Sequence, residues 1–401
     1  MSAIGGTVDL RRGTSDFAML NKMRLAMSMR GRRRSSAYIG KYASMLYNSS
    51  SPDAFSEEED SQPAIFERGG RQYVLCFDGE VYKCPALFER YRIDGIDFLG
   101  SLEGGFSIAL FDGERRMLLL ARDRAGIRPL YYQINDGHIY FASEIRGILA
   151  ASGERVTING EILSFHLSAP CGVYRAANIY ADITEVLPGE CVIFTELGMS
   201  RFRYRDQQLF ALKNSTRRKR AIEPYEACNS ELIDNALSEL LIAFEYPQFD
   251  YFMPSLCEAI ALCAKRNDRA FAFYDPMRIS NLSYSYERDD RLGAFYGLNV
   301  TGVPTREPHS SFDGDILMRD LLIERFENLP TEDKNLLKQI LGERKYDYFA
   351  RRFSNACKKE DAKSEIRILG MLCQTVMWAH SQKLVIRRSG ELLYQSALSI
   401  M

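Results

Sequence analysis

The chain has 401 residues, of which 46% are hydrophobic and 26% charged, and its formal net charge is −1. This length and composition predict two ordinary folded domains and exclude a chain that is disordered throughout. The near-zero net charge gives no overall field that would attract nucleic acid or an anionic membrane surface, so we expect neither as a partner.

The first part of the sequence predicts antiparallel β-structure. Asp-Gly pairs stand between apolar runs at 78–79, 112–113 and 136–137. Glycine accepts the positive φ of a tight turn, so each pair indicates a hairpin, and together they indicate a meander of strands. Helices are predicted at 15–29 and over "EIRGILAAS", residues 144–152.

The second part of the sequence predicts helices. Apolar residues recur at helical spacing over 230–244 and form one stripe, and a further helix is predicted over 254–266. The segment 331–342 predicts a helix with its threonine as the N-cap, acids in the first turn and a glycine at the end. Two more helices are expected near 345–358 and 363–385.

A polar, basic stretch separates these two parts and predicts a linker. We therefore expect one domain at 1–205, a linker at 206–229 and a second domain at 230–401. The basic runs at 217–220 and 30–34 are interpreted as solvated surface, because the overall charge gives no support to a nucleic-acid site.

Cysteine usage and hydropathy bear on the compartment. Nine cysteines are scattered without a CxxC pair and there are four histidines, so a structural zinc site is not expected. Such cysteines are typical of a reducing compartment. The opening "MSAIGGTVDLRRG" lacks the apolar run of a signal peptide, and no run has the length of a membrane span. We expect a cytoplasmic protein.

Five segments of the first part carry a recognisable pattern: "RDRAGIRPLYY" (122–132), "FASEI" (141–145), "LEGGFSIALFD" (102–112), "ITEVLPGECVIF" (183–194) and "QPAIFERGGRQYVLCFDGEVYK" (62–83). Together they resemble the glutamine-dependent asparagine synthetases, and the first of them resembles the signature of that family. The resemblance covers about residues 1–205 and implies a class II glutamine amidotransferase domain, an αββα sandwich of the N-terminal-nucleophile type. The expected fold class is thus α+β, with this sandwich followed by a smaller, mostly α-helical, reduced synthetase domain. In such a sandwich the charged turn 122–128 is predicted to have a structural role between strands, in which paired arginine and aspartate side chains satisfy each other and nearby carbonyls, and not a catalytic role.

The resemblance also assigns the positions of the family's amidotransferase chemistry. The family uses an N-terminal cysteine as nucleophile and its own α-amine as general base. Here the nucleophile position holds Ser2, and the oxyanion position holds Asp78 followed by Gly79. Arg30 and the glycine after it are kept from the family's substrate-binding loop, and Arg30 is the candidate substrate-binding residue.

Four departures predict that the domain does not hydrolyse glutamine. A hydroxyl is less acidic than a thiol, and a carboxylate at 78 would repel a developing oxyanion. The loop at 29–33 keeps only Arg30 and Gly31 of its family residues, and the family segment that binds the glutamine amine is missing. The open alternative is a live nucleophile at Ser2, exposed by removal of Met1.

The second part resembles a reduced synthetase domain, but the family's pyrophosphate loop, serine-glycine-glycine-x-aspartate-serine, is absent from the sequence. Glu245 and Asp275 stand where the family has ATP- and metal-binding acids, and their alternative is ordinary surface or capping carboxylates. Arg278 stands where an acid would help to hold magnesium. ATP and Mg²⁺ are therefore implied only if this domain is active; no other cofactor is expected.

Three functions stay open at this point. The first is a degenerate homologue that acts as a binding protein for an active synthetase or pathway enzyme, with a homo-oligomer as a further option. The second is an active ATP-dependent amide-forming ligase, for asparagine synthesis or for amidation of a peptide or natural product. The third is an N-terminal serine amidohydrolase.

Overall fold

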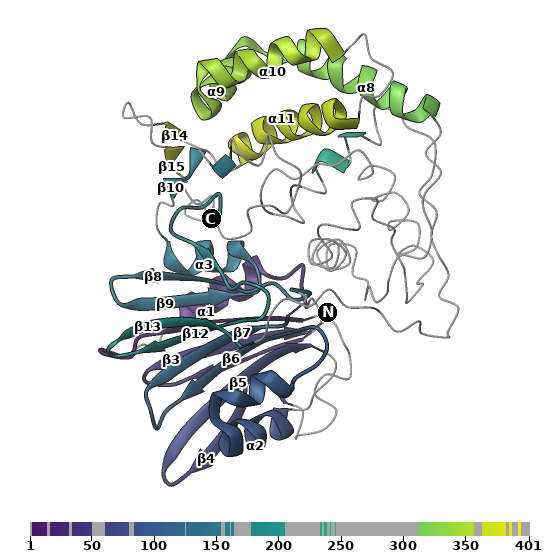
Figure 1. The fold of residues 1–401 in the computed structure, drawn as a ribbon. Helices are drawn as coiled ribbons and strands as arrows, with labels where there is room; N and C mark the ends of the chain where they lie inside the picture. The colour runs from purple at the N-terminus through teal and green to yellow at the C-terminus, as the bar shows by residue number, and fades with distance from the viewer. Residues whose placement is uncertain are drawn as a thin grey trace.

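The chain folds into a layered β-sandwich and a set of helices beside it (Figure 1). The computed structural model describes the following residues: 2–13, 17–31, 34–49, 61–79, 84–124, 126–153, 157–160, 162–163, 178–204, 233–234, 236–238, 241, 245, 312–356, 363–381, 385–386 and 392–393. The predicted linker and the helix predicted over 254–266 lie outside these residues, so the domain boundaries stay a prediction.

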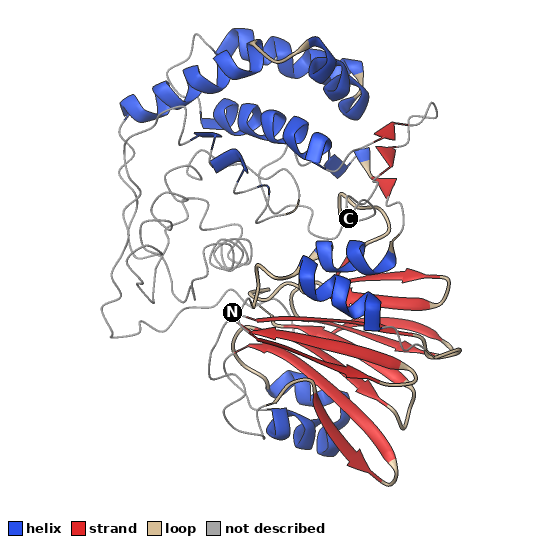
Figure 2. Ribbon diagram, turned by 180° about the vertical axis from the view of Figure 1, so that it is seen from behind, coloured by secondary structure: helices blue, strands red, loops and turns tan. Residues whose placement is uncertain are grey.

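Two six-stranded antiparallel sheets form the sandwich, as Figure 2 shows in red. The first sheet has the spatial order β11 (Thr184–Glu185), β8 (Tyr131–Asn135), β9 (His138–Ala142), β1 (Ser2–Val8), β3 (Ala43–Ser49), β2 (Arg34–Ile39). The second has the order β13 (Gly198–Arg203), β12 (Glu190–Thr195), β7 (Met117–Arg122), β6 (Phe106–Asp112), β5 (Arg71–Gly79), β4 (Ala64–Arg68).

Helices cover the outer faces of both sheets, which completes the four layers. Helices α1 (Phe17–Ala26) and α3 (Ile145–Ser152) pack on the first sheet, while α2 (Cys84–Asp94) and the 3₁₀ helix η2 (Gly95–Ser101) pack on the second (Figure 1). A separate apolar cluster, which includes Ile4 and Val192, fills the space between the sheets. The α+β fold class and the αββα sandwich are confirmed, although the helix α2 was not predicted.

Two of the three predicted hairpins are confirmed. At the β8–β9 turn Asn135 pairs with His138, and Asp136 and Gly137 adopt φ values of 44° and 84°. Glycine accepts such a φ without strain, which is why the sequence signal works there. At the β6–β7 turn the carboxylate of Asp112 accepts the amides of the two residues after the glycine.

The third predicted hairpin, at Asp78-Gly79, is wrong. Both residues lie inside β5 and pair with Ser107 and Phe106 of β6. A Cβ at position 79 would lie 2.8 Å from the carbonyl oxygen of Gly105, so glycine is required here for close approach of another backbone.

The second part of the chain is helical where it is described. Its helices are α8 (Phe312–Glu327), α9 (Thr331–Leu341), α10 (Glu343–Ala356) and α11 (Lys363–Ser381), and a small sheet joins β10 (Thr157–Ile158) to β15 (Leu392–Leu393) and β14 (Val385–Ile386). Helix α8 was not predicted. The N-cap of α9 is Pro330, so the prediction that Thr331 is the cap is wrong, whereas Gly342 ends the helix with φ 81° as predicted. None of the helices in the described part of the chain is long and apolar enough to cross a bilayer.

The helical part shares a core with the sandwich. One apolar cluster contains Met23 of α1, Ile148 of α3 and Trp378 of α11. The predicted stripe at 230–244 enters the same cluster, through Ile233, Ala236, Leu237 and Leu241. The cluster also contains Ile158, Ile179 and Tyr180, and its burial links the helical part to the sandwich.

The buried cysteines give a first test of this packing. Burial raises the pKa of the Cys373 thiol to about 12 and raises that of Cys191 even further above its ordinary value. Because the thiolate is the nucleophile, both should resist iodoacetamide at about pH 8 in the native protein. We expect peptide mapping to find these two cysteines unmodified until guanidinium is added. Labelling of either one under native conditions would contradict the core described above.

Candidate functional site

The predicted nucleophile lies where the two sheets face one another. Ser2 is the first residue of β1 in the first sheet and pairs with Ser49 of β3. Its hydroxyl donates a hydrogen bond to Oδ1 of Asp78, which stands near the end of β5 in the second sheet. The structure therefore joins the predicted nucleophile and oxyanion positions, although 76 residues separate them.

Asp78 is completely buried, and two arginines stand beside it. Arg30 Nη1 lies 3.7 Å from Asp78 Oδ2, and Arg128 Nε lies 3.8 Å from Asp78 Oδ1. Both distances are within ion-pair range. The position at which the family needs a hydrogen-bond donor thus holds a carboxylate that takes the serine hydroxyl and faces two cations.

The prediction that 30–34 is solvated surface is wrong for Arg30, because its side chain is fully buried. Its Nη1 also donates to the carbonyl oxygen of Ser2 at 3.5 Å, and its Nε lies 3.6 Å from Glu144 Oε1. A turn after α1 delivers it to this place, where the next residue, Gly31, has a φ of 87°. A long cation without exposure needs anionic partners, and the local sequence offers none.

The charged turn 122–128 mainly connects neighbouring strands and loops through hydrogen bonds and ion pairs, as predicted. Arg122 pairs with Glu185 and donates to the carbonyl oxygens of Gly126 and Val186 at 2.8 and 3.1 Å. The Asp123 carboxylate accepts three backbone amides, from Phe106, Ile127 and Arg128. Burial raises the pKa of Asp123, and the Arg122 charge and these amides act in the opposite direction.

Arg128 is the exception within this turn. Its backbone amide donates to the Asp123 carboxylate, but its guanidinium lies beside Asp78. We call the group formed by Ser2, Asp78, Arg30 and Arg128 the Ser2 cluster. Sequence reasoning missed this role because the run of charges looks uniform.

Glu245 belongs to the second part of the chain, yet its carboxylate contacts the start of α3 in the first part. Its carboxylate accepts the amides of Ile145 and Arg146 at 3.0 and 2.5 Å, and Arg146 Nε lies 3.1 Å from Oε1. This is the geometry of a capping carboxylate at the N-terminus of α3. Its predicted part in binding ATP or metal stays a prediction, and Asp275 lies outside the described residues.

The charged groups form one continuous line, which we call the buried ion-pair chain. It consists of Arg128, Asp78, Arg30, Glu144, Arg146 and Glu245, with successive charged atoms between 3.1 and 3.8 Å apart. Three cations face three anions, so the group is neutral as a whole, which is the condition for keeping charges out of water. Sequence reasoning missed Glu144 and Arg146 because each takes a second partner, Arg30 for Glu144 and Glu245 for Arg146, from a distant segment.

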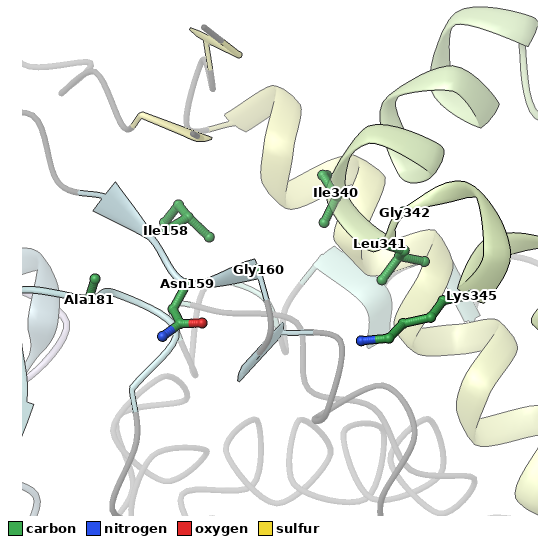
Figure 3. Close-up of a pocket in the computed structure, with 8 residues that line it drawn as sticks. All are labelled: Ile158, Asn159, Gly160, Ala181, Ile340, Leu341, Gly342 and Lys345. Atoms are coloured by element: carbon green, nitrogen blue, oxygen red, sulfur yellow. The ribbon is translucent and has the colours of Figure 1, made fainter. Parts of the chain in front are cut away.

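A pocket of about 430 Å³ lies apart from this cluster (Figure 3). It is lined by Ile158, Asn159, Gly160, Ala181, Ile340, Leu341, Gly342 and Lys345. None of the predicted site residues borders it, and Lys345 is the charged residue among those lining it. Among the residues that the structure describes, no group of three or more histidine, cysteine or acidic side chains could hold a metal ion.

A comparison with known protein families identifies the class of the first domain. Residues 84–205 match the family model described as a glutamine amidotransferase domain, which agrees with the two-sheet sandwich. The described sandwich is thus of the class II glutamine amidotransferase type.

The particular relationship is to the asparagine synthetase family. The chain is 24% identical over 225 residues to asparagine synthetase [glutamine-hydrolyzing] 3 of Bacillus subtilis, covering 51% of this chain and 36% of that protein. It is 28% identical over 171 residues to asparagine synthetase B of Escherichia coli, covering 37% of this chain and 30% of that protein. The chain thus spans about a third of the length of these relatives.

A solved structure of glutamine phosphoribosylpyrophosphate amidotransferase from B. subtilis is also similar, with 13% identity and a TM-score of 0.37. That similarity covers 75% of this chain and 65% of the other. It is too low to bear on function.

Proposed function

We propose that this protein is a degenerate relative of the glutamine-hydrolysing asparagine synthetases that has lost glutaminase activity and acts as a binding partner of another enzyme. The observation that carries this proposal is the hydrogen bond from the Ser2 hydroxyl to the buried Asp78 carboxylate. The predicted nucleophile and the predicted oxyanion position are thus bound to one another.

The electrostatics of the cluster support the loss of activity. Attack on an amide places negative charge on the carbonyl oxygen, and a fixed anion at the oxyanion position raises the energy of that state. Arg30 was predicted to bind substrate, yet its guanidinium faces Asp78 and Glu144. A substrate carboxylate would have to compete with these two buried anions for the same cation.

A glutaminase assay tests the proposal. We expect the purified full chain, with its N-terminus established by intact mass, to release ammonia from glutamine no faster than the Ser2→Ala variant. An active class II amidotransferase, assayed in parallel, serves as the positive control. Ammonia release that Ser2→Ala abolishes would overturn the proposal and support the N-terminal serine amidohydrolase.

The partner and the compartment belong to the same proposal. We propose an active synthetase or another enzyme of the same pathway as the partner, with a homo-oligomer as the alternative. A reducing, cytoplasmic location is supported by Cys191 and Cys373, which are free and buried. The alternative of an ATP-dependent amide-forming ligase stays a prediction, since Asp275 lies outside the described residues.

A further inference from the structure

The N-terminus of α3 is capped from far away in the sequence. Its local candidates do not cap it: the Glu144 side chain makes no capping hydrogen bond, and the Ser143 hydroxyl accepts the amide of Ile4 in β1 instead. The amides of Ile145 and Arg146 are satisfied by Glu245, which is 100 and 99 residues away from them. A helix end inside the protein requires such acceptors, so α3 depends on Glu245.

Glu245 is itself held by Tyr180, which in turn contacts helix α11. Its carbonyl oxygen accepts the hydroxyl of Tyr180 at 2.8 Å, and the indole of Trp378 in α11 donates to that hydroxyl at 3.3 Å. The two rings meet edge to face with centroids 6.1 Å apart. The φ of Glu245 is 67°, a backbone conformation that a glutamate keeps only where its surroundings hold it.

The carboxylate of Glu245 is connected to Ser2 through a series of ion pairs. Its carboxylate pairs with Arg146, Arg146 Nε lies 3.5 Å from Glu144 Oε2, and the second oxygen of Glu144 faces Arg30. Arg30 then contacts both Asp78 and the Ser2 carbonyl. Each charge in this line is buried or mostly buried, so screening by water is weak and a change at one end alters its neighbour.

We propose that Glu245 is a positioning residue that couples the helical part of the chain to the Ser2 cluster. While Tyr180 and Trp378 hold Glu245, Arg146 is fixed on it, and Glu144 and Arg30 keep their places around Asp78. A partner that moved the α11 side of the helical part would withdraw Glu245, uncap α3 and release Arg30 from its present geometry. This coupling holds whether or not Ser2 hydrolyses glutamine.

The test compares two glutamates that resemble one another in burial and pairing. Glu190 is buried, accepts the amide of Leu187 and pairs with Arg201, but it belongs to β12 in the second sheet, outside the buried ion-pair chain. We would measure hydrogen exchange by mass spectrometry on the full chain for Glu245→Gln and Glu190→Gln. Each variant loses the charge and one of the two acceptor oxygens of its glutamate, so the two changes are chemically matched.

We expect Glu245→Gln to accelerate exchange about tenfold in peptides covering α3 and also in the Ser2–Val8 and 27–31 segments. Glu190→Gln should accelerate exchange in β12 and β13 and leave those two segments unchanged. Faster exchange confined to α3 would overturn the coupling and leave Glu245 as a local cap. If Glu245→Gln does not fold, Tyr180→Phe keeps the carboxylate and removes the bond to the Glu245 carbonyl. It should give the same pattern more weakly, and an unchanged Ser2 segment would again overturn the proposal.

Discussion

Replacing Asp78 with asparagine is expected to lower the free energy of unfolding by about 3–5 kcal/mol, because the change removes one partner of a buried ion pair. Asp78 is the anion that stands between Arg30 and Arg128, and it is completely buried. Its loss leaves two buried cations with less compensation, and an amide supplies only a dipole.

Guanidinium denaturation followed by far-UV circular dichroism measures this effect. The matched control is Asp136→Asn, which removes the same charge from an exposed ion pair with Arg12, where the two side chains are 82% and 73% exposed. Exposed pairs contribute little, so this variant should unfold at the wild-type midpoint. If Asp78→Asn were as stable as wild type, the buried ion-pair chain would not stabilise the cluster as we describe it.

Truncating Trp378 to alanine is expected to cost about 3–5 kcal/mol of unfolding free energy. The side chain is fully buried in the cluster that α11 shares with the α1–α3 layer, and its indole N–H serves Tyr180. Trp378→Phe keeps most of the ring but removes the donor, so its cost should be about 1 kcal/mol plus a packing contribution.

Circular dichroism is again the measurement, because Trp378 is the single tryptophan of the chain and its loss removes the fluorescence signal. Leu197→Ala is the control, since that leucine is 99% exposed in the turn between β12 and β13. A Trp378→Ala variant that unfolded together with this control would show that the helical part adds nothing to the stability of the sandwich. It would also remove the anchor that we propose for Glu245.

Local chemistry explains what the sequence predicted well. The hairpins at 112–113 and 136–137 depend on residues within a few positions of each turn. The helices over 17–26 and 331–341 depend on apolar spacing and on residues near their ends. The same Asp-Gly signal failed at 78–79, because there the glycine serves the close approach of another backbone and the aspartate serves two distant arginines.

By itself, the sequence determined the α+β class, the strand-rich first part, the helical second part and the positions of Ser2, Asp78 and Arg30 relative to the related family. Only the tertiary structure decided that these three residues form one cluster. It also decided that the amides at the start of α3 are capped by Glu245 and not by a residue next to them in the sequence.

The physical reason is that a buried charge needs its partners close in space and not close in sequence. The arginines and acids of the buried ion-pair chain come from five separate segments of the chain. Apart from the Glu144–Arg146 pair, no local pattern could join them before the sheets had packed.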